Sequence, residues 1–248
     1  MGLADGLSGG LVVLALVATL ALTISGLWVQ KRRHERFAAW ALRNGWTYTR
    51  SERALVDISR GQPFGQGSSR RAIEVLRGTY DSRSALSFTY QWTTGSGKNR
   101  TTHHAHVVGL ALPTFLPTVE VTPEGIGARL AKLVGAQDVQ FESEAFNRAY
   151  RVAARDQRTG HAILHPRLME RLLRPDALGN AWRIDGTWIL SWESGTTDLD
   201  RLGPRLGLLS AVVRSVPRHV WQDHGYDPTP TTIGQPDAAP APPDATIS

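Results

Sequence analysis

The chain has 248 residues, of which 41% are hydrophobic, and it contains eight Trp, so it can form an apolar core and is not wholly disordered. It has no cysteine, which excludes a disulfide framework, thiolate metal sites and a cysteine nucleophile. The net charge is +6, and all 28 Lys and Arg lie between Lys31 and Arg218. This suggests an anionic partner, but the Arg-, Ala- and Gly-rich composition is better explained by the codon bias of a high-GC bacterial genome.

An uncharged, apolar segment lies close to the N-terminus. Residues 7–29 would extend roughly 34 Å as a helix at about 1.5 Å per residue, which is enough to cross a bilayer core. A cleaved signal peptide is the alternative, but no basic region precedes the apolar run and no small-x-small cleavage site follows it. The sequence therefore predicts a transmembrane helix over 7–29, preceded by a short extracytoplasmic N-terminus over 1–6.

Basic residues flank this segment on its C-terminal side alone. They are Lys31, Arg32, Arg33 and Arg36. Trp28 lies where an interfacial aromatic residue belongs, and residues 30–45 are expected to continue as a basic juxtamembrane helix. The positive-inside rule then predicts a single-pass protein of the cell membrane, with the lipid bilayer as a partner, the N-terminus outside and the remaining chain in the cytoplasm.

Residues 46–226 are predicted to form a globular domain. Three runs alternate between apolar and polar residues and are expected to form an antiparallel meander: 72–80, 84–92 and 103–112. Pro113 and Pro117 are expected to end this sheet, because proline cannot donate a hydrogen bond to a neighbouring strand.

The second half of this domain is expected to contain short helices and one hairpin. Helices are predicted over 122–133, 143–150, 166–173 and from Asp198 or Asp200 to Val216. Asp185-Gly186 predicts a tight turn between two strands. Short strands mixed with short helices, without βαβ spacing, indicate an α+β fold. Residues 227–248 are rich in Pro and Ala, lack aromatic residues and are predicted to be disordered.

A glycine-rich segment, 61–71, is the best candidate for an anion-binding site. Backbone amides around Gly65 and Gly67 could form a nest, and Arg70 and Arg71 could hold a phosphate. The spacing is not the dinucleotide fingerprint, and no helix is expected to follow. The alternative is a surface connection that leads into a strand.

His104 and His106 are the candidates for metal ligands. On a strand they share one face, and two imidazoles at this spacing can bind zinc or copper if a third ligand comes from elsewhere. The alternative is the exposed start of a strand. No catalytic motif is found: His34-Glu35 lacks the second histidine of a zinc protease, and no nucleophile elbow is present. We therefore expect neither a catalytic residue nor a cofactor.

One part of the domain resembles a family of bacterial, actinobacterial-type single-span membrane proteins of unknown function. The segments that carry the resemblance are 141–152, Asp156, 161–173, 61–71, 115–117 and 217–221. The resemblance extends over roughly residues 31–226 and implies a membrane location and a shared fold, with no known activity. Five of its positions have the character of core residues: Phe146, Tyr150, Leu164, Met169 and Leu172.

Three classes of function are compatible with these features. The first is a membrane-anchored interaction or scaffold domain with an unknown protein partner. The second is a domain that binds anionic lipid or a phosphorylated ligand. The third is an unrecognised enzyme. Nucleic acid is not predicted as a partner, and the location of the arginines on the folded domain should distinguish the first two classes.

Overall fold

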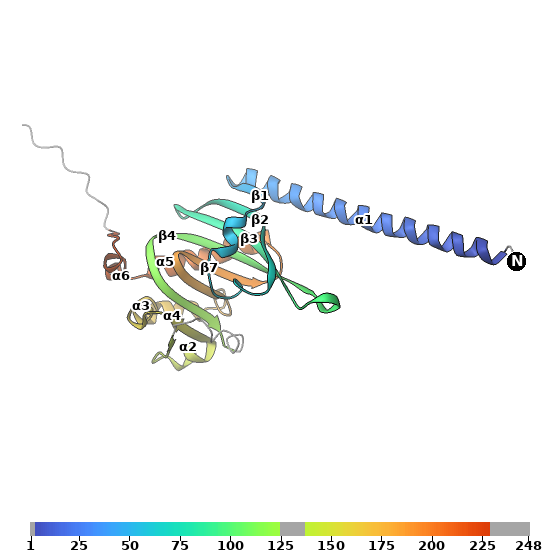
Figure 1. The fold of residues 1–248 in the computed structure, drawn as a ribbon. Helices are drawn as coiled ribbons and strands as arrows, with labels where there is room; N and C mark the ends of the chain where they lie inside the picture. The colour runs from blue at the N-terminus through green and yellow to red at the C-terminus, as the bar shows by residue number, and fades with distance from the viewer. Residues whose placement is uncertain (1–2, 125–136, 229–248) are drawn as a thin grey trace, which may run out of the picture.

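The computed structural model describes residues 3–124 and 137–228 (Figure 1). The long N-terminal helix α1 (Leu3–Arg43) precedes all strands. The strands are β1 (Thr47–Ser51), β2 (Ser68–Tyr80), β3 (Arg83–Thr94), β4 (Thr101–Pro123), β5 (Gln137–Val139), β6 (Tyr150–Ala154) and β7 (Ala181–Ser194). The other helices are η1 (Arg53–Asp57), η2 (Gly97–Asn99), α2 (Glu144–Ala149), α3 (Gln157–Ile163), α4 (Pro166–Leu172), α5 (Leu199–Ser215) and α6 (Arg218–Asp223).

The strands form an antiparallel sheet in the order β1-β2-β3-β4-β6-β5, and β7 pairs with β4. The predicted meander is confirmed by β2, β3 and β4. Asp81 and Ser82 connect β2 to β3, and both have positive φ, which is the requirement of a two-residue type I′ hairpin turn. The predicted helices over 143–150, 166–173 and 198–216 are also confirmed. Ser143 Oγ caps the first of them by accepting a hydrogen bond from the backbone N–H of Phe146.

Strand β4 does not end at its prolines, as the sequence had suggested. It continues to Pro123, and its register with β7 shifts between Ala111 and Leu116, where the bulged backbone accommodates residues that lack an N–H. Beyond the bulge, β4 pairs with β6. Residues 122–123, predicted to start a helix, therefore end a strand; residues 125–133 of that prediction and 229–248 of the predicted tail lie outside the described residues.

The predicted hairpin at Asp185-Gly186 is also wrong. Strand β7 runs through Gly186 without turning back, and Gly186 pairs with Leu116 at the irregular part of β4. Gly186 has a positive φ, and this backbone conformation forms part of the irregular pairing. The Asp-Gly dipeptide thus marks a local distortion of a long strand in place of a turn.

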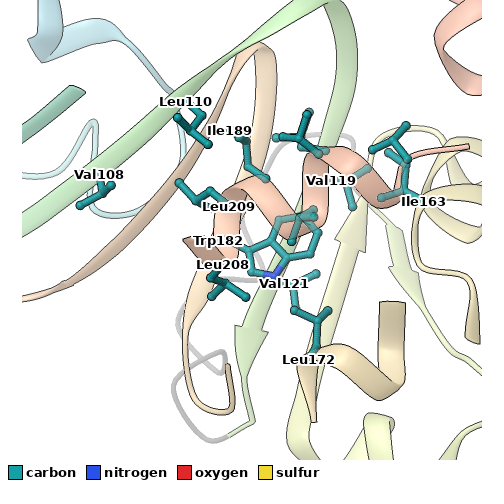
Figure 2. Close-up of a cluster of buried hydrophobic side chains, with 14 of the residues drawn as sticks. Val108, Leu110, Val119, Val121, Ile163, Leu172, Trp182, Ile189, Leu208 and Leu209 are labelled. Atoms are coloured by element: carbon teal, nitrogen blue, oxygen red, sulfur yellow. The ribbon is translucent and has the colours of Figure 1, made fainter. Parts of the chain in front are cut away.

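Apolar cores lie on both faces of the sheet. Helix α5 covers one face, and Figure 2 shows its Leu208 and Leu209 among Leu110, Ile189 and Trp182. This core also contains all five predicted core positions of the 141–173 region. The other face carries Leu86, Phe88 and Tyr90, which are covered by Leu55 of η1 and by Phe64.

Helix α1 projects away from the sheet (Figure 1). It runs without a break from Leu3 to Arg43, and its described part contains Thr19, Thr23 and Ser25 as well as the charged residues from Lys31 onward. Among the residues that the structure describes, no helix is long and apolar enough to cross a membrane. This finding contradicts the predicted transmembrane helix over 7–29. It therefore also contradicts the predicted single-pass location in the cell membrane and the orientation that was inferred from the basic flank.

Candidate functional site

A polar groove of about 1080 Å³ lies where α1 meets the sheet. Its walls come from Gln30, Arg33 and His34 of α1, from the β1–η1 region (50–57), and from the first half of β2 (67–74). The charged side chains that line it are Arg33, Arg50, Arg53, Arg70, Arg71, Glu52, Asp57 and Glu74. Arginines from four separate elements, α1, β1, η1 and β2, therefore converge on one concave surface.

Most of this positive charge is not neutralised within the protein. Glu52 binds Arg77, with 2.6 Å between carboxylate and guanidinium, and Glu74 binds Arg33. Within residues 3–124 and 137–228, the other four arginines of the groove form no ion pair with a carboxylate: Arg50, Arg53, Arg70 and Arg71. All four are exposed. A concave surface with unneutralised arginines attracts anions and can hold them through bidentate hydrogen bonds.

The structure brings three of the four predicted anion-binding residues to this groove. Gly67, Arg70 and Arg71 line it, whereas Gly65 does not. The glycines have another role, because they let the loop pack closely on the sheet. A Cβ on Gly67 would lie 2.2 Å from the carbonyl oxygen of Thr93, and a Cβ on Gly61 would overlap the guanidinium of Arg183. The loop thus positions the arginines.

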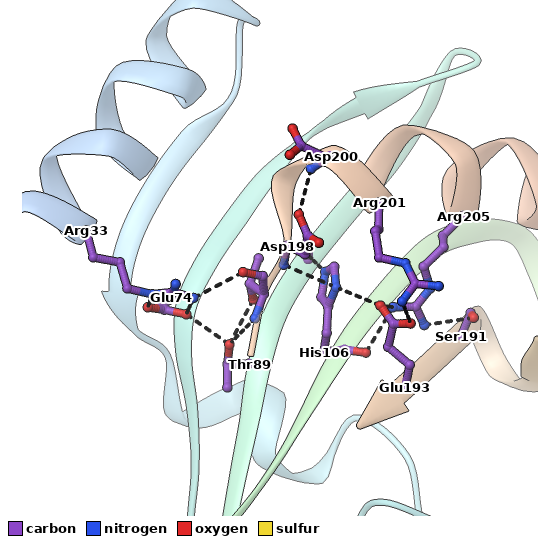
Figure 3. A network of polar contacts seen from close by, with 12 residues as sticks. Arg33, Glu74, Thr89, His106, Ser191, Glu193, Asp198, Asp200, Arg201 and Arg205 are labelled. Carbon is purple, nitrogen blue, oxygen red and sulfur yellow. Dashed lines mark hydrogen bonds and ion pairs between the residues drawn. The ribbon is translucent and has the colours of Figure 1, made fainter. Parts of the chain in front are cut away.

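An ion pair between Arg33 and Glu74 forms part of the groove wall. Arg33 Nη2 donates hydrogen bonds to Glu74 Oε2 at 2.9 Å and to the carbonyl oxygen of Thr197 at 3.1 Å. Thr89 Oγ1 donates to the same carboxylate at 3.0 Å. The hydrogen bonds that Arg33 donates to Glu74 are the main cause that raises the pKa of Arg33. Figure 3 shows this pair at the junction of α1 and the sheet.

The polar contacts continue beneath the N-terminal end of α5, around His106 (Figure 3). Its Nε2 lies 2.9 Å from Ser87 Oγ, and its Nδ1 accepts a hydrogen bond from the backbone N–H of Asp198 at 3.4 Å. Glu193 Oε1 lies 3.6 Å from Nδ1. Burial nevertheless lowers the pKa of His106, against the opposing effect of Glu193. The imidazole is therefore neutral at neutral pH.

Arg205 of α5 supports the same cluster from above. Its guanidinium donates to Ser191 Oγ at 2.9 Å and to the carbonyl oxygen of His106 at 3.2 Å, and it lies 3.3 Å from Glu193 Oε1. Burial lowers the pKa of Arg205 to about 10, which still leaves it charged at neutral pH. A buried cation of this kind needs its counter-ion, and Glu193 supplies it.

These positions argue against the predicted metal candidates. Both ring nitrogens of His106 already have hydrogen-bond partners, and His104 lies further along β4, opposite Gln91. In the described ranges, no three His, Asp or Glu side chains are grouped so that they could hold a metal ion. The sequence-based alternative of an exposed strand start fits neither residue, because His104 is half-buried and His106 is fully buried.

The basic flank of α1 divides into residues with different environments. Trp28 and Lys31 are exposed, and the Lys31 ammonium lies 5.9 Å from the centre of the Trp28 ring. Arg32 and Arg36 line a second hollow of about 580 Å³, which Asp198 and Asp200 also line. Arg33 alone of this cluster bonds to the sheet. Arg33, which the sequence analysis treated only as part of the positive-inside pattern, therefore connects the helix to the domain.

Arg50, Arg53 and Glu74 were missed by the sequence analysis. Each is an isolated charged residue in its own segment, and no spacing rule relates them to Arg70 and Arg71. Glu74 did carry one detectable signal. It breaks the alternation of β2, where the register with β3 shifts between Ile73 and Leu76.

Comparison with known proteins finds a similarity of fold. No family model and no curated protein matches the chain. Among solved structures, the chain is similar to the mycobacterial trehalose monomycolate transport factor A, TtfA, with a TM-score of 0.56 and 13% sequence identity. The match covers 74% of this chain and 96% of that one. At this identity the likeness shows a shared fold. The resemblance to uncharacterised bacterial membrane proteins stays a prediction.

Proposed function

We propose that this protein takes part in lipid transport or lipid association, and that it binds the anionic headgroup of an amphiphile in the arginine-lined groove. The observation that carries the proposal is the set of four exposed arginines around one concavity, none of them paired with a described carboxylate. Asp57 is the only lining carboxylate of the groove without an arginine partner in the described chain, so the unneutralised charge is clearly positive.

The surroundings of the groove match a molecule with a polar head and an apolar tail. Apolar lining is confined to Val56, Ala72 and Ile73, so the groove suits a headgroup better than an acyl chain. Gln30 forms part of the rim, and the preceding residue, Val29, is 67% exposed. Further along α1, Leu20 and Leu16 are also exposed. A headgroup in the groove would thus leave its chain beside apolar side chains of α1.

The shared fold with TtfA adds support of a different kind. That protein is described as a transport factor for trehalose monomycolate. Fold alone does not define a ligand, because one fold can host unrelated functions. The likeness supports lipid transport as the class of process, and the groove supplies the chemistry of recognition.

Vesicle sedimentation tests the proposal with the full chain. We expect stronger sedimentation with phosphatidylglycerol-containing vesicles than with phosphatidylcholine alone, since each arginine near an anionic surface contributes about 1 kcal/mol. The double variant Arg70→Ala, Arg71→Ala should lose roughly tenfold or more of the charge-dependent part. The matched control is Arg167→Ala, Arg174→Ala, which removes two exposed arginines at α4, far from the groove (Figure 1).

The same experiment separates lipid recognition from simple adhesion. If sedimentation is independent of lipid charge, or if both double variants weaken it equally, the groove is not a headgroup site. Glycerol phosphate added as a soluble competitor tests the headgroup chemistry itself. It should reduce sedimentation of the unaltered protein with anionic vesicles and leave the groove variant unaffected.

A protein-interaction or scaffold role is the second candidate. It is favoured by the exposed apolar residues along the projecting helix, of which Leu14 is 70% and Leu16 is 65% exposed. Such a surface commonly binds another protein. This role predicts that replacing Leu14, Leu16 and Leu20 by Gln abolishes co-purification of a partner, while the Arg70→Ala, Arg71→Ala variant retains it.

A further inference from the structure

We propose that Glu74 is an internal counter-anion of the groove, and that an anionic headgroup bound there competes with Glu74 for Arg33 and thereby loosens α1 from the domain. This inference rests on the proposed function and specifies how the same site is regulated. The relevant contacts are those between Arg33, Glu74 and Thr89, which Figure 3 shows together.

The backbone places Glu74 in an unusual conformation. Its φ is +55°, in the left-handed region that residues other than glycine rarely adopt. The conformation belongs to a β-bulge, because β2 has one residue more than β3 between the pairs Ile73–Thr89 and Leu76–Ser87. A bulge of this kind changes the direction of a side chain, and here the carboxylate points to the base of α1. The unfavourable backbone conformation of Glu74 thus occurs where its carboxylate binds Arg33.

Arg33 connects three parts of the molecule. It belongs to α1, it binds Glu74 of β2, and it donates to the carbonyl oxygen of Thr197, which precedes α5. Its side chain is 38% exposed, whereas that of Glu74 is 8% exposed. A ligand in the groove can therefore reach the guanidinium from solvent, and the carboxylate already occupies the position that the anion would take.

The competition has a mechanical consequence for α1. Phe37 and Ala41 are buried against the domain, and the Phe37 ring lies 5.8 Å from the Tyr48 ring, so the C-terminal end of α1 stays attached. Arg33 lies one turn before Phe37 in α1, and Figure 3 shows its side chain extending from this helix to Glu74. When an anion displaces Glu74, this outer contact is lost and α1 can tilt about its remaining anchors.

Linkage makes the relation reciprocal. If a bound anion weakens the Arg33–Glu74 pair, then weakening that pair by mutation must strengthen anion binding. Glu74→Gln should therefore bind glycerol phosphate about fivefold or more tightly than the unaltered chain, the lower end of typical coupling between sites. Loss of a negative charge beside the groove also favours anion binding by itself, so the movement of α1 is the measurement that identifies competition.

A distance measurement on the full chain tests the mechanical part. The chain has no cysteine, so Ala18→Cys on α1 and Thr79→Cys on β2 give two unique sites for spin labels, and both residues are exposed. We expect a narrow distribution of label-to-label distances without ligand. Glycerol phosphate, and separately vesicles containing phosphatidylglycerol, should broaden it. Glu74→Gln and Arg33→Gln should be broad without ligand, and Glu170→Gln on α4 is the charge-matched control.

The outcomes distinguish the two proposals. If anion binding depends on Arg70 and Arg71 but the distance distribution does not change and Glu74→Gln binds no more tightly, the competition is refuted and the headgroup site stands. If inorganic phosphate broadens the distribution as much as glycerol phosphate, free phosphate is the ligand in place of a headgroup. Should Glu74→Gln fail to fold, Glu74→Asn serves instead, because asparagine tolerates positive φ.

Discussion

The sheet face beneath α5 has two ends, and they are built from opposite kinds of residue. Three neighbouring strands place one residue each in a row across this face, and the rows are defined by the register of β3, β4 and β7. The apolar row consists of Ala85, Leu110 and Ile189. The polar row lies four residues away from the apolar row on each strand and consists of Thr89, His106 and Glu193.

This difference shows that the apolar row contributes more to stability than the polar row does. Apolar side chains on three strands would bury more surface against α5 if they continued to the end. Instead the polar row adjoins the Arg33–Glu74 pair and, through it, the groove. Buried polar residues must all be paired to be tolerated. We infer that the apolar end stabilises the domain and that the polar end connects α1 to the groove.

The largest effect is expected at the apolar end. Leu110 is fully buried and faces α5, so Leu110→Ala should lower the free energy of unfolding by roughly 2–5 kcal/mol, from lost burial and the cavity that remains. Urea unfolding of the full chain measures this. Leu42→Ala, at a residue that is 84% exposed, should change stability by less than about 0.5 kcal/mol. Equal effects in the two variants would contradict the assigned core.

A smaller loss is expected when the polar end loses one charge. Glu193→Gln keeps the shape of the side chain but leaves Arg205, only 4% exposed, without its counter-ion. We expect a loss of roughly 1–3 kcal/mol in the free energy of unfolding, the usual range for an unsatisfied buried polar group. Glu170→Gln removes an exposed carboxylate and should be nearly neutral. If Glu193→Gln is equally neutral, Arg205 does not depend on this pair.

A change at the N-terminus of α5 should lower the free energy of unfolding by a still smaller amount. Asp198 caps this helix by accepting a hydrogen bond from the backbone N–H of Asp200 at 3.0 Å. Asp198→Ala should cost about 1 kcal/mol, and Asp198→Asn should restore most of it because asparagine also caps helices. Thermal unfolding of both variants provides the measurement. A failure of asparagine to restore stability would mean that charge, and not capping, is what matters at this position.

The sequence predicted those parts of the molecule that depend on neighbouring residues. Alternation of Leu86, Phe88 and Tyr90 identified β3 and its buried face, because side-chain direction in a strand repeats every two residues. Ser143 and Asp156 cap the helices that follow them, which is a similarly local effect. Pro113 was misjudged, since whether a proline ends a strand depends on a bulge in the pairing with β7, which is distant in the chain.

The candidate site shows the same limit. Arg70 and Arg71 stood out because they are adjacent and follow a glycine-rich segment. Arg50 joins them only through the pairing of β1 with β2, which no local pattern specifies. The apolar run over 7–29 was interpreted as a membrane-crossing helix, with residues 30–45 expected to continue it as a basic helix. The structure shows one continuous helix that proceeds into the domain, where Arg33 serves a contact that the positive-inside rule could not anticipate.

Acid is expected to lower the stability of the protein through the polar end alone. Burial lowers the pKa of His106, and the charged groups that face it are Glu193 of β7, Arg205 of α5 and Asp198 before α5. The unfolded chain has an ordinary histidine with a pKa of about 6.5, so between the two pKa values the unfolded state binds more protons than the folded state. Stability from this group is therefore complete above about pH 6.5 and is lost as the pH falls through the lower, folded pKa.

The test is the free energy of unfolding from pH 8 to pH 5, measured for the full chain and for His106→Gln, which cannot titrate. Above about pH 7 the two curves should run parallel, and below about pH 6.5 the unaltered protein should lose stability faster. The window ends at pH 5 so that Glu193, whose own pKa is lowered chiefly by the neighbouring His106 side chain, remains ionised throughout. Leu110→Ala, which alters the apolar row, should shift the whole curve without changing its slope. Curves that stay parallel down to pH 5 would show that His106 is not the titrating group, and the polar row would then differ from the apolar row in stability but not in its response to acid.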